Sequence, residues 1–417
     1  MFASGRSKIA PTMMYKDTAC GEKKNMENER RRRRRKRRAK KGKLLLPVLI
    51  AIIGVGLVLF FATNGKPKDP TEPVEADVTK IHLAFGGDLN ITDDVVAAAG
   101  SDGCFQEAFL DIVHLLSNAD LAALNLEGTF SGGPYGSESK SAPANLAVAL
   151  KKAGVDLLQL ANSCTIRGGI GGLVSTIDTV KYAGIEPLGV SRSEEEHQGF
   201  SMMEVKGVKI AFVAFTKGMD GMTLPAGSEG CVNLLYEDYD STYQKVDETG
   251  ISKIMEKVNA AKPDLVVAML HWGSEFNDTI SDSQEKICKL LQEKGADVLI
   301  GTHPHYVQKM VFDKGKGTFI AYSLGDFFGD ATRAGSEYSV ILDLEVTKNN
   351  ETGETKVTGF DYTPIFTVRQ EFRYLRVMRI EETMAAYENQ YMDAVPESVY
   401  NAMKYALKRI EARIKGN

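Results

Sequence analysis

The stretch Asp297-Val298-Leu299-Ile300-Gly301-Thr302-His303-Pro304-His305 joins a short apolar run to two histidines. The apolar run is typical of a buried β-strand, and the histidines follow where that strand would end. In an open α/β sheet, ligands bind at the carboxyl edge of the strands, and imidazoles held there can bind a metal ion. A single His-x-His pair, however, is more often part of an ordinary surface turn. The other strand ends therefore decide between the two interpretations.

Groups that can bind a metal follow most of the other apolar runs in the same way. They are Asp88 after residues 81–85, Asn125 and Glu127 after 121–124, Asn162 after 157–160, His271 and Glu275 after 265–270, and Asp326 after 319–322. Each one alone is more simply a turn or capping residue. Six such strand ends at one sheet edge indicate a metal site. Carboxylate, amide and imidazole groups together suit Mn²⁺, iron or Zn²⁺ better than Ca²⁺, and they suffice for one or two divalent ions.

The alternation of short apolar runs with helical stretches predicts βαβ units and hence an α/β fold. Further strands are expected at residues 209–215 and 339–346, and helices at 105–116, 171–182 and 284–294. Ser281 or Asp282 can cap the start of the last helix, and Gly295 can end it. Residues 366–417 are expected to form a C-terminal helical segment, because residues 385–414 read as one or two amphipathic helices.

The N-terminal region predicts a membrane anchor. Residues 44–62 form an apolar run without a charge, and 19 helical residues at about 1.5 Å each span a hydrocarbon core of roughly 30 Å. Residues 1–43 carry 17 basic and 4 acidic residues, and such a positive flank stays in the cytoplasm. We therefore expect a single-pass protein of the cell membrane with a cytoplasmic tail and an extracellular main domain. A cleaved signal peptide fits less well, because the run is long and no small-residue cleavage site follows it.

The rest of the chain is acidic, unlike the N-terminal region. Because the whole chain has a net charge of −4 and residues 1–43 carry +13, residues 44–417 carry −17, which argues against nucleic acid as a partner. Residues 63–79 contain three closely spaced prolines and read as an extended linker, so the main domain is expected over residues 80–365. The cysteines are too scattered for a dense disulfide framework. Met26 is a second candidate start of the chain.

Taken together and in order, these motifs resemble the CapA proteins of poly-γ-glutamate capsule synthesis, a family similar to the calcineurin-like metallophosphatases. The resemblance covers about residues 80–330. It rests on Gly87-Asp88, Asn125-Leu126-Glu127-Gly128, Ala161-Asn162, His271-Trp272-Gly273-x-Glu275, Gly301-x-His303-Pro304-His305 and Tyr322-Ser323-Leu324-Gly325. The resemblance implies a four-layer α/β/β/α metallophosphatase-like sandwich, here preceded by one transmembrane helix.

The resemblance also implies roles for individual residues. The implied metal ligands are Asp88, Glu127, Asn162, His271, His303 and His305. The residues expected to bind substrate are Asn125, Trp272 and Glu275, and those expected to be catalytic are Cys164, His271 and His305.

Three positions depart from the family pattern. The chain reads Asn162-Ser163-Cys164 where CapA proteins usually have Asn-Asn-His, and it has Arg167 and Asp326 where an aspartate and an asparagine are usual. In metallophosphatases the histidine of an Asn-His pair protonates the leaving group. A thiol, with a pKa near 8.5, is a weaker acid than an imidazole near 6.5. Cys164 is therefore a soft metal ligand, the trace of a lost catalytic acid, or a small buried residue.

Two functions follow from this pattern. The first is a membrane-tethered, metal-dependent hydrolase or transferase of the capsule or envelope that acts on a phosphoester or amide-type linkage. The second is a non-catalytic metal-binding scaffold for an anionic polymer or for its synthesis and export proteins. The Asp, Glu, Asn and His set favours metal binding in both cases, whereas Cys164 and Arg167 favour the scaffold.

Overall fold

The computed structural model describes residues 77–99, 103–329, 333–369, 375–391 and 395–416. The expected cytoplasmic tail, the apolar run 44–62 and nearly all of the expected linker lie outside these residues. Within the described ranges, no helix has both the length and the apolar character needed to cross a bilayer.

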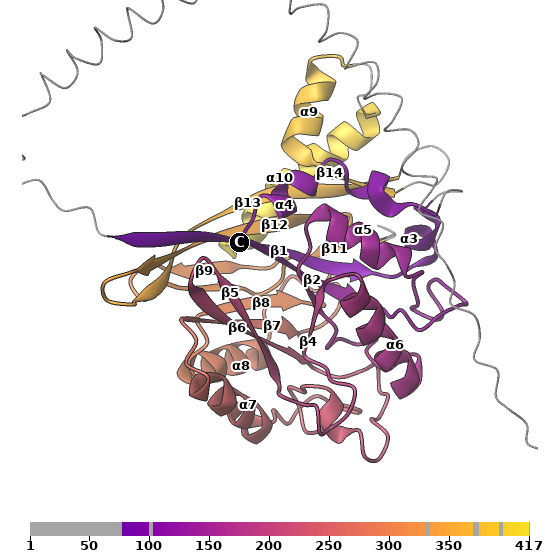
Figure 1. Cartoon of the computed structure of the whole chain (residues 1–417). Helices are drawn as coiled ribbons and strands as arrows, with labels where there is room; N and C mark the ends of the chain where they lie inside the picture. The colour runs from indigo at the N-terminus through magenta and orange to yellow at the C-terminus, as the bar shows by residue number, and fades with distance from the viewer. Residues whose placement is uncertain (1–76, 100–102, 330–332, 370–374, 392–394, 417) are drawn as a thin grey trace, which may run out of the picture. The chain divides into compact units, whose positions relative to one another are not determined.

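Two mixed β-sheets form the centre of the domain (Figure 1). The eight-stranded sheet has the order β14-β13-β12-β1-β2-β3-β4, with β11 also paired to β1. Its strands are β1 (Val78–Asn90), β2 (Leu121–Glu127), β3 (Leu157–Gln159), β4 (Glu186–Leu188), β11 (Asp326–Phe328), β12 (Tyr338–Asn349), β13 (Thr355–Arg369) and β14 (Leu375–Arg379). The six-stranded sheet has the order β5-β6-β7-β8-β10-β9. Its strands are β5 (Phe200–Val205), β6 (Val208–Thr216), β7 (Leu265–His271), β8 (Val298–Thr302), β9 (Met310–Asp313) and β10 (Thr318–Ala321).

Helices cover the outer face of each sheet, so that the layers follow the expected α/β/β/α order. One apolar core lies between the eight-stranded sheet and its helices, a second lies between the two sheets, and a third lies between the six-stranded sheet and its helices. The helices of the first outer layer are α3 (Asp93–Ala97), η1 (Phe105–Phe109), α4 (Val113–Ser117), α5 (Asn145–Ala153) and α6 (Gly169–Tyr182). Those of the other outer layer are α7 (Glu248–Ala260) and α8 (Asp282–Glu293).

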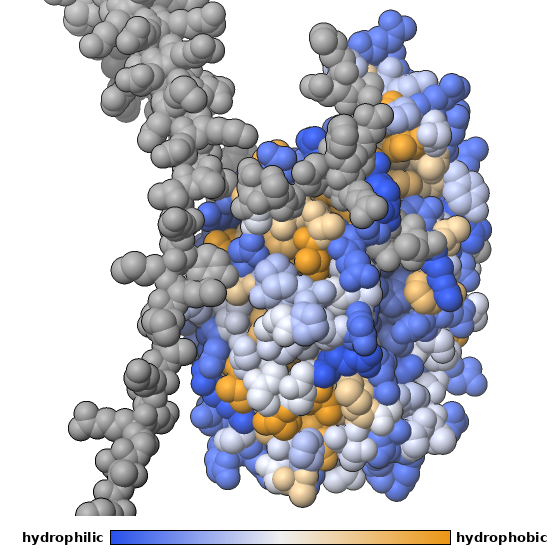
Figure 2. Space-filling model, turned by 90° about the vertical axis from the view of Figure 1, so that its right-hand side faces the viewer, coloured by the Kyte–Doolittle hydropathy of each residue, from blue (hydrophilic) through white to orange (hydrophobic). Residues whose placement is uncertain are grey.

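The alternation of side chains along β1 shows how one strand serves two cores. Ile81, Leu83 and Phe85 belong to the core between the sheets, whereas Ala84 belongs to the outer core beneath the helices. Successive residues of a strand point to opposite faces, and each fully buried large apolar side chain contributes about 1.5–3 kcal/mol. On the face shown in Figure 2, the remaining hydrophobic residues form separate patches among hydrophilic and neutral ones.

The C-terminal segment differs from the expectation. Residues 366–417 were expected to be helical, but β13 continues to Arg369 and β14 follows before the helices α9 (Ile380–Glu388) and α10 (Glu397–Lys415) begin. Phe366 and Val368 belong to the core between the sheets, whereas Ile365 belongs to the outer core, which is the period of a strand and not of a helix. Residues of α10 complete the core between the sheets, so the C-terminal helix belongs to the domain.

Local signals place the other helices correctly to within a few residues. Helix α8 begins with a capping box, in which the Ser281 hydroxyl accepts from the backbone of Gln284 while the Gln284 side chain accepts from the backbone of Ser281. Gly295 follows the helix at φ 96°, a conformation that glycine adopts at no steric cost. The helix expected at 105–116 is divided into η1 and α4.

Candidate metal centre

The carboxyl ends of strands from both sheets meet at one buried cluster of polar side chains. Strands β1 and β2 pair in parallel, as do β7 and β8, so their carboxyl ends share an edge. Asp88 lies near the end of β1, Glu127 and His271 are the last residues of β2 and β7, and His303 follows β8 directly. Asp88 and His271 are fully buried, and Glu127 and His303 are each 4% exposed.

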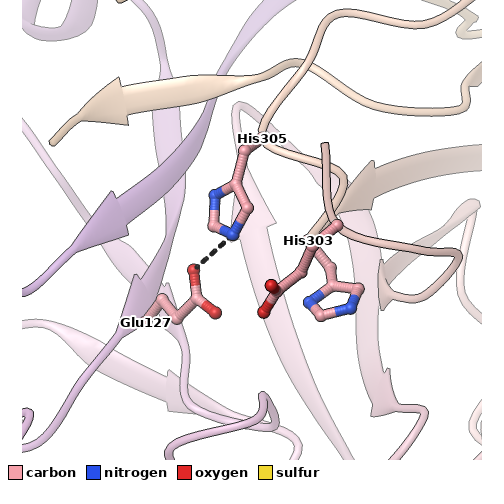
Figure 3. A group of neighbouring side chains, drawn as sticks. Glu127, His303 and His305 are labelled. Carbon is pink, nitrogen blue, oxygen red and sulfur yellow. Dashed lines mark ion pairs between the residues drawn. The ribbon is translucent and has the colours of Figure 1, made fainter. Parts of the chain in front are cut away.

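Two groups of side chains in this cluster are close enough to hold an ion. Glu127, Glu275, His303 and His305 each offer one ligand atom, and these four atoms all lie within 4.8 Å of one another. Asp88, His305 and Asp326 form a second group by the same measure, so His305 belongs to both. Figure 3 shows the side chains of Glu127, His303 and His305 converging, with the ion pair of Glu127 and His305 dashed.

Asp88 is held by donors on both of its oxygens. The Asn125 amide donates to Oδ1 at 2.5 Å, and the backbone N–H of His303 donates to Oδ2 at 2.8 Å. Burial, together with the negative charges of Glu127 and Asp326, raises the pKa of the Asp88 carboxyl well above its ordinary value. Asn125, which was expected to bind substrate, thus orients a candidate ligand.

Glu127 has one satisfied and one unsatisfied oxygen. Ser163 Oγ donates to Oε1 at 2.9 Å, while Oε2 is buried without a hydrogen-bond partner among the described residues and lies 3.7 Å from His305 Nε2. Burial raises the pKa of Glu127, but its interactions with His305, His271 and Lys140 and the hydrogen bond from Ser163 outweigh it and leave the pKa below its ordinary value. Glu127 is therefore an anion at neutral pH.

The three histidines are held in different protonation states. Burial lowers the pKa of His271 to about 3 and the pKa of His303 well below its ordinary value, so both rings are neutral near pH 7. Burial also lowers the pKa of His305, but the negative charges of Asp326 and Glu127 outweigh it and place this pKa well above the ordinary value. Neutral imidazole is the form that binds a metal ion.

The backbone is strained at two of these histidines, His303 and His305. His303 has φ 90° and His305 has φ 57°, a left-handed region that few residues other than glycine adopt. Such strain costs about 1–3 kcal/mol per residue and clusters at functional sites. Beside Asp88, position 87 requires a glycine, because a Cβ there would lie 1.7 Å from the carbonyl oxygen of Gly325. This close approach brings β11, and with it Asp326, against the end of β1.

The structure shows the surroundings of three further residues that were expected in the site. Trp272 does not fit the expected substrate-binding role, because its side chain is fully buried in the core beneath α7 and α8, where the indole donates to the Tyr322 carbonyl at 2.8 Å. Glu275, expected to bind substrate, lies in the first ligand group. The Asn162 side chain lies beside Asn125, but its Oδ1 accepts from the backbone N–H of Cys164 at 2.9 Å.

Cys164 and Ser163 share one turn but have different surroundings. The Cys164 side chain is 1% exposed and belongs to neither ligand group, and burial raises the pKa of its thiol well above the ordinary value. Ser163 instead reaches the candidate ligands, with Oγ 2.9 Å from Glu127 Oε1 and 3.0 Å from His271 Nε2. Within this turn, the residue that contacts the site is therefore the serine.

Sequence reasoning missed Lys217 as a part of the site, and it gave Asp326 as a strand-end group but not as one of the implied ligands. Asp326 Oδ1 lies 2.7 Å from His305 Nδ1. Lys217, which follows β6, donates to the Gly273 carbonyl at 2.9 Å and has its Nζ 3.4 Å from His303 Nε2. Asp326 was expected among the strand-end groups that can bind a metal, and it was also a departure from the family pattern. Lys217 follows Thr216 at the end of β6, and this strand-end position was the only feature of the sequence that could have indicated a role in the site.

The donor set fits a divalent transition metal. Two buried atoms that could act as ligands, Glu127 Oε2 and His303 Nδ1, have no hydrogen-bond partner among the described residues. A buried polar atom left without a partner is costly, and a metal ion would satisfy both atoms. Carboxylates mixed with neutral imidazoles are ligands for Mn²⁺, iron or Zn²⁺.

Comparisons with known proteins show which proteins this chain is similar to. The profile of the family described as "Bacterial capsule synthesis protein PGA_cap" matches residues 82–331. Capsule biosynthesis protein CapA of Bacillus anthracis is 26% identical over 314 residues, which are 72% of this chain and 73% of that protein. PGA biosynthesis protein CapA of Bacillus subtilis strain 168 is 26% identical over 327 residues, 75% of this chain and 80% of that protein. A solved phosphatase from Mycoplasma pneumoniae is 13% identical with a TM-score of 0.42, covering 70% of this chain and 95% of its own.

Proposed function

The chain belongs to the family of bacterial capsule synthesis proteins PGA_cap, and from this we propose that it acts in the synthesis of a capsule polymer, with poly-γ-glutamate as the candidate. The name of the Bacillus subtilis relative, a PGA biosynthesis protein, supports that polymer, and the name of the Bacillus anthracis relative supports a role in capsule synthesis. We further propose that the cluster around His305 is a metal-dependent, phosphoesterase-like site. The observation that carries this proposal is the convergence of buried carboxylates and neutral imidazoles from both sheets, with two buried atoms left unpaired.

Glu127, Glu275, His303 and His305 would hold one ion, and Asp88, His305 and Asp326 would hold a second. When bound, divalent ions would supply Lewis-acid polarisation of a phosphoryl or carbonyl oxygen. Asn162 and His271 lie beside these groups and complete the expected set, with His271 Nδ1 3.8 Å from Asp88 Oδ1.

The residues of the chain itself would orient the reacting groups and control protons. Asn125 and the His303 backbone fix Asp88, while Ser163 links Glu127 to His271. Among the three residues expected to be catalytic, His305 is the one whose raised pKa keeps a proton near neutral pH. His271 is neutral, and the Cys164 thiol, with its raised pKa, is a poor acid. Binding of a metal ion would require His305 to release that proton, so a leaving group would have to take its proton from another source.

The second candidate function is a metal-binding scaffold without catalysis. The observation that favours it is Cys164, a buried thiol at the position where the family usually has a histidine. A scaffold would use the same ligands to bind an anionic polymer through the positive charge of its metal, or to join the polymer's synthesis and export proteins.

We also propose that the protein is anchored in the cell membrane through residues 44–62, with residues 1–43 in the cytoplasm and the described domain outside. The arginine run ahead of the apolar segment supports this topology. Protease added to intact protoplasts should then digest the domain, and complete protection of the domain would rule the topology out.

The test of the site is metal analysis of the full-length chain in detergent, together with a screen of phosphoesters and of poly-γ-glutamate. Bound transition metal with turnover of any of these substrates supports the hydrolase. Bound metal without turnover favours the scaffold. A chain that binds no Mn²⁺, Fe²⁺ or Zn²⁺ at micromolar concentration would overturn both forms of the proposal.

A further inference from the structure

The last turn of α10 holds a buried, charged side chain. Arg413 is 7% exposed, and its Nε donates to Asp278 Oδ2 at 3.1 Å. Its guanidinium lies over the Tyr306 ring, 4.5 Å from the centroid, and 5.5 Å from that of Tyr338. Arg409, one turn earlier, also donates to Asp278, at 3.2 Å. A buried guanidinium needs such partners, because an unpaired charge in the interior is very unfavourable.

Two of the residues that Arg413 contacts, Tyr306 and Asp278, lie on loops that carry candidate metal ligands. Tyr306 directly follows His305, and Asp278 lies three residues after Glu275. The C-terminal helix therefore contacts the loop after β7 and the loop after β8 at the same time. It lies against β12 and β13, with the C-terminus marked in Figure 1, and it is outside the segment that matches the family profile.

Phe276 connects these two loops to each other and to the ligands. Its ring stacks on His305 with centroids 4.9 Å apart and meets the Tyr306 ring edge-on at 5.9 Å. Its backbone N–H donates to the Pro304 carbonyl at 2.9 Å. The contacts from Arg413 through Tyr306 and Phe276 to His305 are thus continuous, which is the physical requirement for one residue to act on another at a distance.

The loops need support from outside, because their backbone is strained. Phe276 has φ 53°, which adds a third non-glycine residue in the left-handed region to His303 and His305. Residues in this region keep their conformation only where the surrounding structure fixes it. The ring contacts and the ion pair of Arg413 fix the far side of both loops, while Asp88 accepts from the His303 backbone on the near side.

We propose that α10 is a positioning element of the candidate metal centre and that Arg413 is its positioning residue. In this proposal Arg413 holds the two loops in the relation that brings Glu275 and His305 to one ion. The proposal rests on the metal centre proposed above but not on hydrolysis. It assigns a role in the site to a helix that the family match does not reach.

The test compares three variants of the full-length chain. Arg413→Met keeps the apolar stem and removes the charge, Arg413→Lys keeps a charge that can face Tyr306 and Asp278, and Lys408→Met changes an exposed residue of the same helix. Zn²⁺ affinity is measured by competition with a chelator, and circular dichroism checks the fold. Because distant residues modulate binding by about 0.5–2 kcal/mol, we expect Arg413→Met to bind Zn²⁺ roughly 2- to 30-fold more weakly. Arg413→Lys should recover most of the affinity, and Lys408→Met should bind as wild type.

A folded Arg413→Met variant with wild-type affinity would overturn the proposal, and so would an Arg413→Lys variant as weak as Arg413→Met. If Arg413→Met does not fold, Asp278→Asn, at a half-exposed partner, takes its place with the same expected direction of change. Hydrogen exchange of the metal-free chain separates this proposal from the metal site. Faster exchange of the Phe276 amide in the variant supports the role of Arg413 even if wild type binds no Zn²⁺. Unchanged exchange there, with unchanged affinity, rejects it.

Discussion

Asp326 Oδ1 lies 2.7 Å from His305 Nδ1, and this contact turns the other ring nitrogen of His305 toward Glu127, 3.7 Å away. Both side chains of the contact are nearly fully buried. A carboxylate that accepts from one nitrogen of a metal-binding histidine fixes the tautomer and orientation of the ring. The aspartate that departs from the family pattern therefore has a specific partner within the site.

The first prediction is that Asp326→Asn weakens metal binding. An amide can still contact His305, but it lacks the charge that holds the Nδ1 proton, so Zn²⁺ affinity should fall about 10- to 100-fold. The matched control is Asp343→Asn, because Asp343 forms a similar pair with His82, at 3.1 Å, on a half-exposed surface. Chelator competition on both variants provides the measurement. Equal affinities in the two variants would remove Asp326 from the site.

The second prediction concerns the histidines of the six-stranded sheet. The double variant His271→Ala and His303→Ala should lose most of its bound metal, because it removes two neutral imidazoles whose ring centroids lie 4.5 Å apart. Metal content per chain is measured by elemental analysis after dialysis. His114→Ala on α4 is the control, and it should retain the wild-type stoichiometry. An unchanged stoichiometry in the double variant would contradict the proposed centre.

The third prediction is that Ser163→Ala is rescued by metal. In the metal-free chain, loss of the hydroxyl leaves Glu127 Oε1 and His271 Nε2 without this partner, which should lower the free energy of unfolding by about 1–3 kcal/mol. Saturating Zn²⁺ should restore most of the loss, because Glu127 lies in a ligand group and His271 is an expected ligand, so an ion would engage both side chains in place of the hydroxyl.

Ser191→Ala is the matched control for Ser163→Ala. Ser191 is also buried, and its hydroxyl donates to the Ser193 carbonyl at 2.8 Å, in a region outside the ligand cluster. Its loss of stability should remain in Zn²⁺. Urea unfolding of both variants with and without metal makes the comparison, and a Ser163→Ala deficit that metal leaves in place would contradict the prediction.

The fourth prediction concerns the missing leaving-group acid. If the site hydrolyses phosphoesters, Cys164→His should raise kcat on an ester with a poor leaving group, because general acid catalysis typically contributes about 10²–10⁴-fold. An ester whose leaving group departs without a proton should respond much less. Since Cys164 is 1% exposed, Cys164→Ser, which preserves the volume, serves as the control with measured metal content. A wild-type chain that is already fast on the poor leaving group would show that another residue, such as His305, supplies the proton.

The fifth prediction is that the free energy of unfolding of the metal-free chain depends on pH through His271. Its pKa is lowered from 6.5 to about 3 in the folded chain, so between these values the unfolded state holds more protons and stability rises with pH. At 1.36 kcal/mol per pH unit, acidification from pH 6.5 to 4 should cost the metal-free chain about 3 kcal/mol through this residue. His271→Asn should lack that part of the loss in urea unfolding with EDTA present, whereas His114→Asn should retain it. Parallel pH profiles for wild type and His271→Asn would contradict the assignment.

Strand order and burial explain what the sequence could predict. Short apolar runs followed by polar groups are local signals, and the carboxyl ends of parallel strands necessarily share an edge, so the meeting of Asp88, Glu127 and the histidines was predictable. Trp272 was misjudged because neighbouring residues of an extended chain point to opposite faces: His271 lies in the site and Trp272 lies in the core beyond the sheet.

Other features depend on contacts that no local pattern contains. Ser163 reads as an ordinary turn residue until the fold places Glu127 and His271 on either side of its hydroxyl. Arg413 is a polar member of an amphipathic helix, and its burial against Tyr306 arises only when the C-terminal helix packs on the loop after β8. The end of β13 and the whole of β14 were missed because the clear helical period of residues 385–414 was extended too far toward the N-terminus.

The pairing of β1 has a consequence for how the protein is made. Strand β1 is central in its sheet, with β2 on one side and β12 on the other, and Val78 pairs with Asn349. During synthesis, one edge of β1 stays open until more than two hundred further residues have emerged, and pairings of such long range form slowly. An open strand edge is a site for association with other chains. We therefore expect the incomplete chain to need protection by a chaperone, and the ligand cluster to assemble only after synthesis has passed β12.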